Sequence, residues 1–178
     1  MGYRTGGSAA WTGGVLLGAV LAALVAGGSA RAEALRAGAA RVDVTPTTLP
    51  VLVNGGMTSR SLERVKSPLH ARAIALESGP TRVAIVVVDT CMLSRGFLDE
   101  TKTLVEARHG IPADRVLVAA THTHSAPAAM GCLGTDADPA YVPFLRERIV
   151  EAVGAAVAAL EPATVGFARA DAADYTAL

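Results

Sequence analysis

The run Val83-Ala84-Ile85-Val86-Val87-Val88 is the stretch that decides the fold. It is continuously apolar and mostly β-branched, so it predicts a strand buried on both faces, in a parallel or mixed sheet with helices above and below. Val116 to Ala120 predicts another short buried strand. Between these two strands, Gly96 to His109 has the apolar spacing of a helix, and Gly110 is placed to end it. Strands that alternate with helices predict an α/β layered domain.

The same pattern extends outward toward both ends of the domain. Three further strands are expected: Leu35–Val44, His70–Leu76 and Ala163–Ala170. Thr47 to Ser67 predicts a long loop, because it is rich in turn residues. Asp138-Pro139 predicts the start of a long helix that reaches Leu160, with Asp138 as its N-cap. We therefore expect a mixed or largely parallel sheet flanked by helices.

Composition excludes two broad classes of protein. Of the 178 residues, 51% are hydrophobic, which is enough apolar surface to build a core and argues against a disordered chain. The 16 basic residues balance 16 acidic ones, and no basic stripe is present. This balance argues against a protein that binds nucleic acid through charge.

The first 32 residues have the order of a secretory signal peptide. Arg4 precedes an apolar run from Trp11 to Ala26, and the small residues of Ala30-Arg31-Ala32 fit a cleavage site. The alternative is a retained membrane anchor, but the run is shorter than the roughly 20 residues that span a bilayer. We therefore expect export to the periplasm or the cell exterior and a mature chain of residues 33–178.

Export makes a disulfide chemically possible for the two cysteines of the chain, Cys91 and Cys132. Each follows a predicted strand, so the two side chains could approach one another. Buried neighbouring cysteines often remain thiols, and the sequence leaves both states open.

The chemistry of the chain centres on the histidines of Val116 to Pro127 (VLVAATHTHSAP). His122 and His124 follow a buried strand at its carboxyl end, where open α/β sheets bind ligands. In extended chain, residues i and i+2 point to the same side, so both imidazoles face one cavity. Two imidazoles on one side form half of a plausible zinc site. The alternative is a pair of hydrogen-bonded histidines that shapes a loop.

Ala120 to Pro127 (ATHTHSAP) resembles the T-H-T-H-S-G-P signature of the neutral, non-lysosomal ceramidase family. Four other segments resemble blocks of that family in the same order: AARVDVTP (39–46), PLHARA (68–73), RVAIVVVD (82–89) and GIPADRVL (110–117). Together they cover nearly all of the mature chain. Residues 33–178 thus resemble the N-terminal portion of a ceramidase catalytic domain.

The resemblance implies a zinc-dependent amidase that cleaves the N-acyl bond of ceramide-like lipids, with transient contact to a membrane surface. In the family's signature the first histidine is a zinc ligand, which implies that His122 holds the metal. The second lies beside the substrate carbonyl, which implies a catalytic role for His124. The family's other metal ligands are a His, a Glu and a Tyr farther along, and this chain has no His after His124. We therefore expect the 178 residues to be the N-terminal part of a longer enzyme or a truncated gene product. Residues 33–178 by themselves should bind zinc weakly and show no amidase turnover.

Two other functions remain as alternatives. H-x-H at a strand end also resembles the metal site of amidohydrolase barrels, although a barrel needs about 250 residues. A secreted ceramidase-like domain that binds a ligand without catalysis would also carry this pattern. The oligomeric state is left open by the sequence.

Other polar residues have both a functional and a structural interpretation. Asp89, at the end of the apolar strand, either orients a metal-binding histidine or is a loop carboxylate. Asn54-Gly55-Gly56 either presents backbone N–H groups to an oxyanion or forms a plain turn. Four further residues are expected to be structural or solvated: His70, His109, Arg60 and Arg64.

Overall fold

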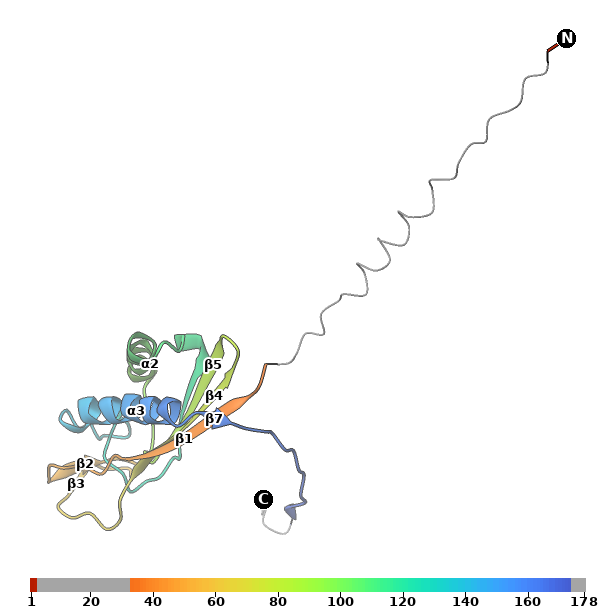
Figure 1. The fold of residues 1–178 in the computed structure, drawn as a ribbon. Coiled ribbons are helices and arrows are strands. Elements are labelled where there is room, and N and C mark those ends of the chain that lie inside the picture. Colours follow the sequence, from red (N-terminus) through yellow and green to blue (C-terminus); the bar gives the residue numbers. More distant parts are fainter. Residues whose placement is uncertain (3–32, 174–178) are drawn as a thin grey trace. The chain divides into compact units, whose positions relative to one another are not determined.

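The computed structural model describes Met1, Gly2 and residues 33–173. The remainder of the predicted signal peptide lies outside the described residues. The chain divides into two units, residues 1–32 and residues 33–178. The second unit contains a five-stranded sheet with the order β6-β5-β4-β1-β7 (Figure 1).

The strands of this sheet are β1 (Arg36–Asp43), β4 (His70–Ser78), β5 (Thr81–Val88), β6 (Val116–Ala120) and β7 (Glu161–Pro162). Pairs β1–β4, β4–β5 and β1–β7 are antiparallel, and β5–β6 is parallel. The sheet is therefore mixed, which confirms the predicted α/β class.

Two long helices, α2 (Arg95–His109) and α3 (Tyr141–Ala158), lie on the same side of the sheet (Figure 1). Ser94 caps α2, since its Oγ accepts a hydrogen bond from the Phe97 N–H at 3.2 Å. Gly110 ends α2 as predicted, and its N–H donates to the carbonyl of Glu106. A short 3-10 helix, η1 (Ala113–Arg115), then leads into β6.

Helix α3 packs on the centre of the sheet and closes the core. Its apolar side chains meet the buried face of the strands; the core includes Val42, Val86, Val88, Leu145, Ile149 and Val153. Gly38 in β1 permits this close approach, because a side chain there would overlap the carbonyl oxygen of Ala156. The Tyr141 hydroxyl donates to the carbonyl of Val44 at 2.8 Å, and burial raises its pKa well above the usual range.

Asp138 caps the turn that leads into α3, two residues before Ala140, which directly precedes the helix. Its Oδ1 accepts hydrogen bonds from the N–H groups of Ala140 and Tyr141, at 3.1 and 3.0 Å. Its carbonyl accepts from the Val142 N–H, which is the first helical hydrogen bond. Within the described residues, neither helix combines the length and apolarity that crossing a bilayer requires.

The prediction that β5 and β6 are buried on both faces is wrong. In β5, Val86 and Val88 are buried, whereas Ile85 and Val87 are each 38% exposed; in β6, Leu117 is 57% exposed. In the described part of the chain the helices therefore cover one face of the sheet. A β-branched run favours a strand, but it does not say whether a layer covers the second face.

Two other predictions also need correction. Residues 47–67 are not only loop, because they contain an antiparallel hairpin of β2 (Val51–Val53) and β3 (Arg60–Leu62). The predicted strand over residues 163–170 is wrong, since β7 ends at Pro162. Pro162, the last residue of β7, pairs with Arg36, the first residue of β1. A longer β7 would therefore run past the end of β1 and find no partner there.

Candidate functional site

The two histidines of the loop after β6 meet through their ring nitrogens. His124 Nε2 lies 3.2 Å from His122 Nε2, and the ring centroids are 4.8 Å apart in an edge-to-face arrangement. The expected alternation of extended chain does not produce this pair, because His122 has a left-handed backbone with φ of 61°. The rings nonetheless lie together, as the sequence predicts.

Cys91 orients the ring of His122. Its carbonyl oxygen lies 2.9 Å from His122 Nδ1, and because a carbonyl can only accept, Nδ1 carries the hydrogen. In the neutral ring, Nε2 then holds a lone pair. The contact follows from the topology: β5 and β6 are parallel neighbours, so the residues after their carboxyl ends meet at one edge of the sheet.

Cys91 also brings a thiol to the pair. Its Sγ lies 3.9 Å from His122 Nδ1, and burial raises the pKa of the thiol. The sequence alone indicates this cysteine only as a disulfide candidate. The signal that identifies it as a site residue is its place just after β5, at the edge that holds the histidines. Both Cys91 and Cys132 are free thiols in the structure.

One donor atom from each of Cys91, His122 and His124 lies within 4.8 Å of the others. Two imidazoles and a thiol are ligands that zinc prefers. The donor types and their closeness therefore fit zinc, with the His122 Nε2 lone pair as the proposed ligand and the His124 ring beside it.

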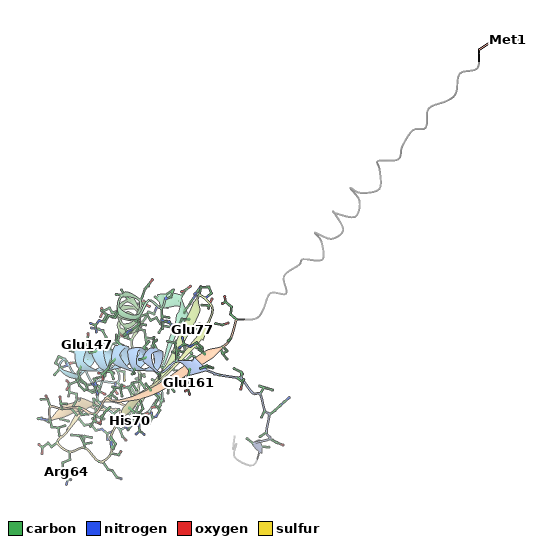
Figure 2. All side chains as sticks on the ribbon, viewed as in Figure 1. Met1, Arg64, His70, Glu77, Glu147 and Glu161 are labelled. Carbon is green, nitrogen blue, oxygen red and sulfur yellow. The ribbon has the colours of Figure 1, made fainter. Side chains whose placement is uncertain are left out.

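The β2–β3 hairpin borders the histidines. Arg60 is exposed, as expected, and its Nη2 donates to the carbonyl of His124 at 2.8 Å. Asn54 is buried, and its Nδ2 donates to the carbonyl of Met130 at 2.7 Å. Gly55 lies directly against the His124 ring. Arg64 is exposed and projects outward from the loop after β3 (Figure 2).

Asp89 and His109 make structural contacts. Asp89 accepts from the His70 N–H and the Arg72 guanidinium, both at 2.9 Å, so its described contacts support the interpretation as a loop carboxylate. His109 Nε2 lies 3.1 Å from the carbonyl of Val150, which joins α2 to α3.

Two cavities border the histidine loop. The first, of about 320 Å³, is bordered by His122 together with apolar side chains that include Met92, Leu98 and Met130. The second, of about 450 Å³, is bordered by Thr123 and Ser125 and by apolar residues of the hairpin and the segment that follows it, including Leu62 and Val65. The histidines are thus accessible beside apolar surface.

Comparison with known proteins gives structural relatives. No family model matches the chain. A crystal structure of neutral ceramidase from Pseudomonas aeruginosa superposes with a TM-score of 0.63 at 20% identity, over 73% of this chain and 22% of that one. A ceramidase complexed with C2 superposes with a TM-score of 0.61 at 22% identity, with the same coverages. The chain thus spans about a fifth of the length of these structures, and at such identities the likeness shows that it shares their fold over this part.

Proposed function

We propose that this chain supplies the H-x-H part of a zinc-dependent amidase site that cleaves the N-acyl linkage of ceramide-like lipids. The observation that carries the proposal is the pair of Nε2 atoms, 3.2 Å apart, of His122 and His124 at the carboxyl end of β6. The fold around this pair is one that solved neutral ceramidases share.

His122 is the proposed metal ligand. The hydrogen bond from Nδ1 to the Cys91 carbonyl fixes the ring so that the Nε2 lone pair faces His124. Metal-binding histidines commonly have their second nitrogen held in this way. Zinc, when bound, is a Lewis acid that polarises an amide carbonyl and makes water a nucleophile near neutral pH.

His124 is the proposed catalytic group. With the lone pair on His122 Nε2, the neutral His124 ring carries its hydrogen on Nε2, and the 3.2 Å contact is a hydrogen bond between the two rings. A metal on His122 would take up that lone pair and leave the His124 N–H as a donor beside it. A donor placed there stabilises the negative charge that develops on the carbonyl oxygen during amide cleavage.

The apolar surroundings suit a lipid substrate. The walls of both cavities are largely apolar, although Arg64 and Lys66 also border the larger one, so an acyl chain can lie next to the reacting amide. A substrate of this class resides in a membrane, and transient contact with the membrane surface is part of the proposal.

Export is also part of the proposal. It rests on the sequence of residues 1–32, in which an apolar run from Trp11 to Ala26 precedes the small residues of Ala30-Arg31-Ala32. Mass analysis of the exported protein should find an N-terminus near Glu33. An intact Met1 terminus in a membrane fraction would contradict export with cleavage.

The roles of the two histidines are tested with His122→Ala and His124→Ala in the protein purified from the cells that naturally produce it. We expect His122→Ala to lower zinc content and amide hydrolysis together, because it removes a metal ligand. We expect His124→Ala to keep most of the zinc and to lower kcat by roughly 10²–10³-fold, because it removes a donor to the developing charge. Elemental analysis and kcat on an N-acyl sphingosine measure the two effects.

His109→Ala serves as the control, because His109 lies between the two helices. Loss of zinc in His124→Ala with retention in His122→Ala would reverse the assignment. Zinc and activity retained in both histidine variants would show that the loop is not the active site. A wild-type protein that binds the lipid without hydrolysing it would favour the non-catalytic alternative.

A further inference from the structure

The β2–β3 hairpin is joined to the histidine loop by backbone contacts. Val53 forms an antiparallel bridge with Pro127, and the Ala128 N–H donates to the carbonyl of Leu52 at 2.7 Å. The loop segment after the histidines therefore runs beside β2 in the manner of a short extra strand. A displacement of this hairpin displaces the loop.

Gly55, in the turn that follows β2, forms a wall against the His124 ring. A Cβ atom at this position would lie 2.6 Å from Cγ and 2.7 Å from Cβ of His124. Its φ of +96° is also a backbone conformation that residues other than glycine rarely adopt. The next residue differs, because the nearest atom to a Cβ on Gly56 is the carbonyl oxygen of Thr58 at 3.7 Å, an ordinary contact.

Arg60, on the other strand of the hairpin, holds the backbone of the same histidine. Its Nη2 donates to the carbonyl oxygen of His124 at 2.8 Å. Arg60 is the register partner of Val53, which itself bridges to Pro127. The hairpin thus touches His124 at two points, the ring through Gly55 and the backbone through Arg60.

We propose that Gly55 and Arg60 are positioning residues that set the 3.2 Å contact between His124 and His122. Neither side chain adds a donor or acceptor to the reacting atoms. Gly55 supplies space that a methyl group would fill, and Arg60 fixes the peptide plane after His124. The inference deepens the proposed function, because it concerns where His124 is held, but its first test needs neither zinc nor substrate.

The test compares Gly55→Ala with Gly56→Ala in the 178-residue protein. Long-range ¹H–¹⁵N spectra report the tautomer and hydrogen bonding of imidazole rings, and the chain has four histidines. We expect Gly55→Ala to change the ring signals of His122 and His124, because the added methyl pushes the His124 ring away. Unchanged signals of His70 and His109 would show that the fold is retained. Gly56→Ala should leave all four rings unchanged.

Arg60→Ala keeps the inference testable if Gly55→Ala fails to fold. We expect it to shift the same two rings, with Arg60→Lys restoring them in part, because lysine retains one donor but not the planar fork. Arg41→Ala is the matched control, since Arg41 is an exposed arginine on β1 that borders neither cavity. Ring signals that respond to neither Gly55→Ala nor Arg60→Ala would overturn the inference.

The second measurement is kcat of the protein purified from the cells that naturally produce it. Misplacing a catalytic group by about 1 Å can cost about 10²-fold in rate, so Gly55→Ala should lower kcat by about 10²-fold. KM and zinc content should stay close to the wild-type values, because the proposed ligand and the substrate cavities are untouched. If the wild-type protein hydrolyses no amide, the proposed function fails while the ring spectra still decide whether Gly55 and Arg60 position His124.

Discussion

His122 leaves β6 in a left-handed backbone conformation that costs on the order of 1–3 kcal/mol for a residue of this kind. The hydrogen bond from its ring to the Cys91 carbonyl offsets part of that cost. Strain of this kind persists only where the surroundings enforce it, and here it turns the ring toward His124. The contact with Cys91 therefore matters to the conformation as well as to the tautomer of His122.

The environment of Cys91 leads to a prediction on thiol reactivity. Cys91 is buried and burial raises its pKa, so little thiolate forms near neutral pH, whereas Cys132 is only half-buried. We expect iodoacetamide to modify Cys132 well before Cys91 in the native protein. Peptide mapping by mass spectrometry over time measures the order, with the denatured chain as the control in which the two rates converge. Faster native modification of Cys91 would contradict its burial.

At the residue scale, the sequence predicts the histidine pair but not the residues that hold it. The H-x-H pattern lies within three residues, and its position after an apolar run indicates the end of a strand. Cys91, Gly55 and Arg60 reach the pair from distant parts of the chain. Their contacts depend on strand order and hairpin formation, which no local pattern specifies.

Among the elements, the β2–β3 hairpin and α3 are linked through one carboxylate. Asp138 caps α3 with Oδ1, and its Oδ2 accepts from the Leu52 N–H at 3.1 Å. One side chain thus satisfies the first turn of the helix and a backbone donor of β2.

Replacing Asp138 should therefore destabilise the domain more than the loss of an ordinary cap. We expect Asp138→Ala to lower the free energy of unfolding by about 2 kcal/mol, because it removes the cap and leaves the Leu52 N–H without its partner. Asp138→Asn retains acceptor oxygen and should recover part of the loss. Asp136→Ala, an exposed aspartate two residues earlier, should stay within about 0.5 kcal/mol of wild type. Urea unfolding measures all three variants, and equal effects of Asp136→Ala and Asp138→Ala would contradict the link.

The longer elements are predictable from sequence, and the short ones are not. Helix α2 carries its cap and its terminating glycine in the sequence, and β4 and β5 have a clear turn between them. The strands β2 and β3 have three residues each, too few for alternation to show against the prolines and glycines around them. The strand expected over residues 163–170 has suitable residues but no partner, because β1 begins at Arg36.

On the scale of the whole domain, one face of the sheet exposes large apolar side chains in the part of the chain that the structure describes. Ile74, Ile85 and Leu117 are register partners on β4, β5 and β6, and all three are exposed. They form a row of large apolar side chains across neighbouring strands. Such exposed patches are prone to association.

We therefore expect the 178-residue protein to self-associate as its concentration rises, and Leu117→Lys to reduce this tendency. The lysine lies on strand β6 at the edge of the sheet, where a charge also opposes pairing with other chains. Val165→Lys is the matched control, since Val165 is exposed outside the sheet. Light scattering against concentration measures the effect. Equal scattering from wild type and Leu117→Lys would contradict a role for the patch.

The class of the whole fold is predictable because alternating strands and helices leave few architectures. Whether helices cover one face of the sheet or both is not predictable. The run Val83 to Val88 is apolar at every position, so it does not distinguish a buried second face from an exposed one. Only the three-dimensional arrangement shows that both helices lie on the same side.

The contact between Gly55 and His124 has a consequence for protein engineering. An H-x-H motif grafted onto the end of a strand in another scaffold would bring the two imidazoles but not the surface that orients them. The unit to transfer is the motif together with a neighbouring hairpin. The hairpin must carry a glycine against the ring of the second histidine and an arginine that donates to the backbone carbonyl of that histidine. A database search for similar centres gains selectivity in the same way, by requiring the distant glycine as well as the histidines.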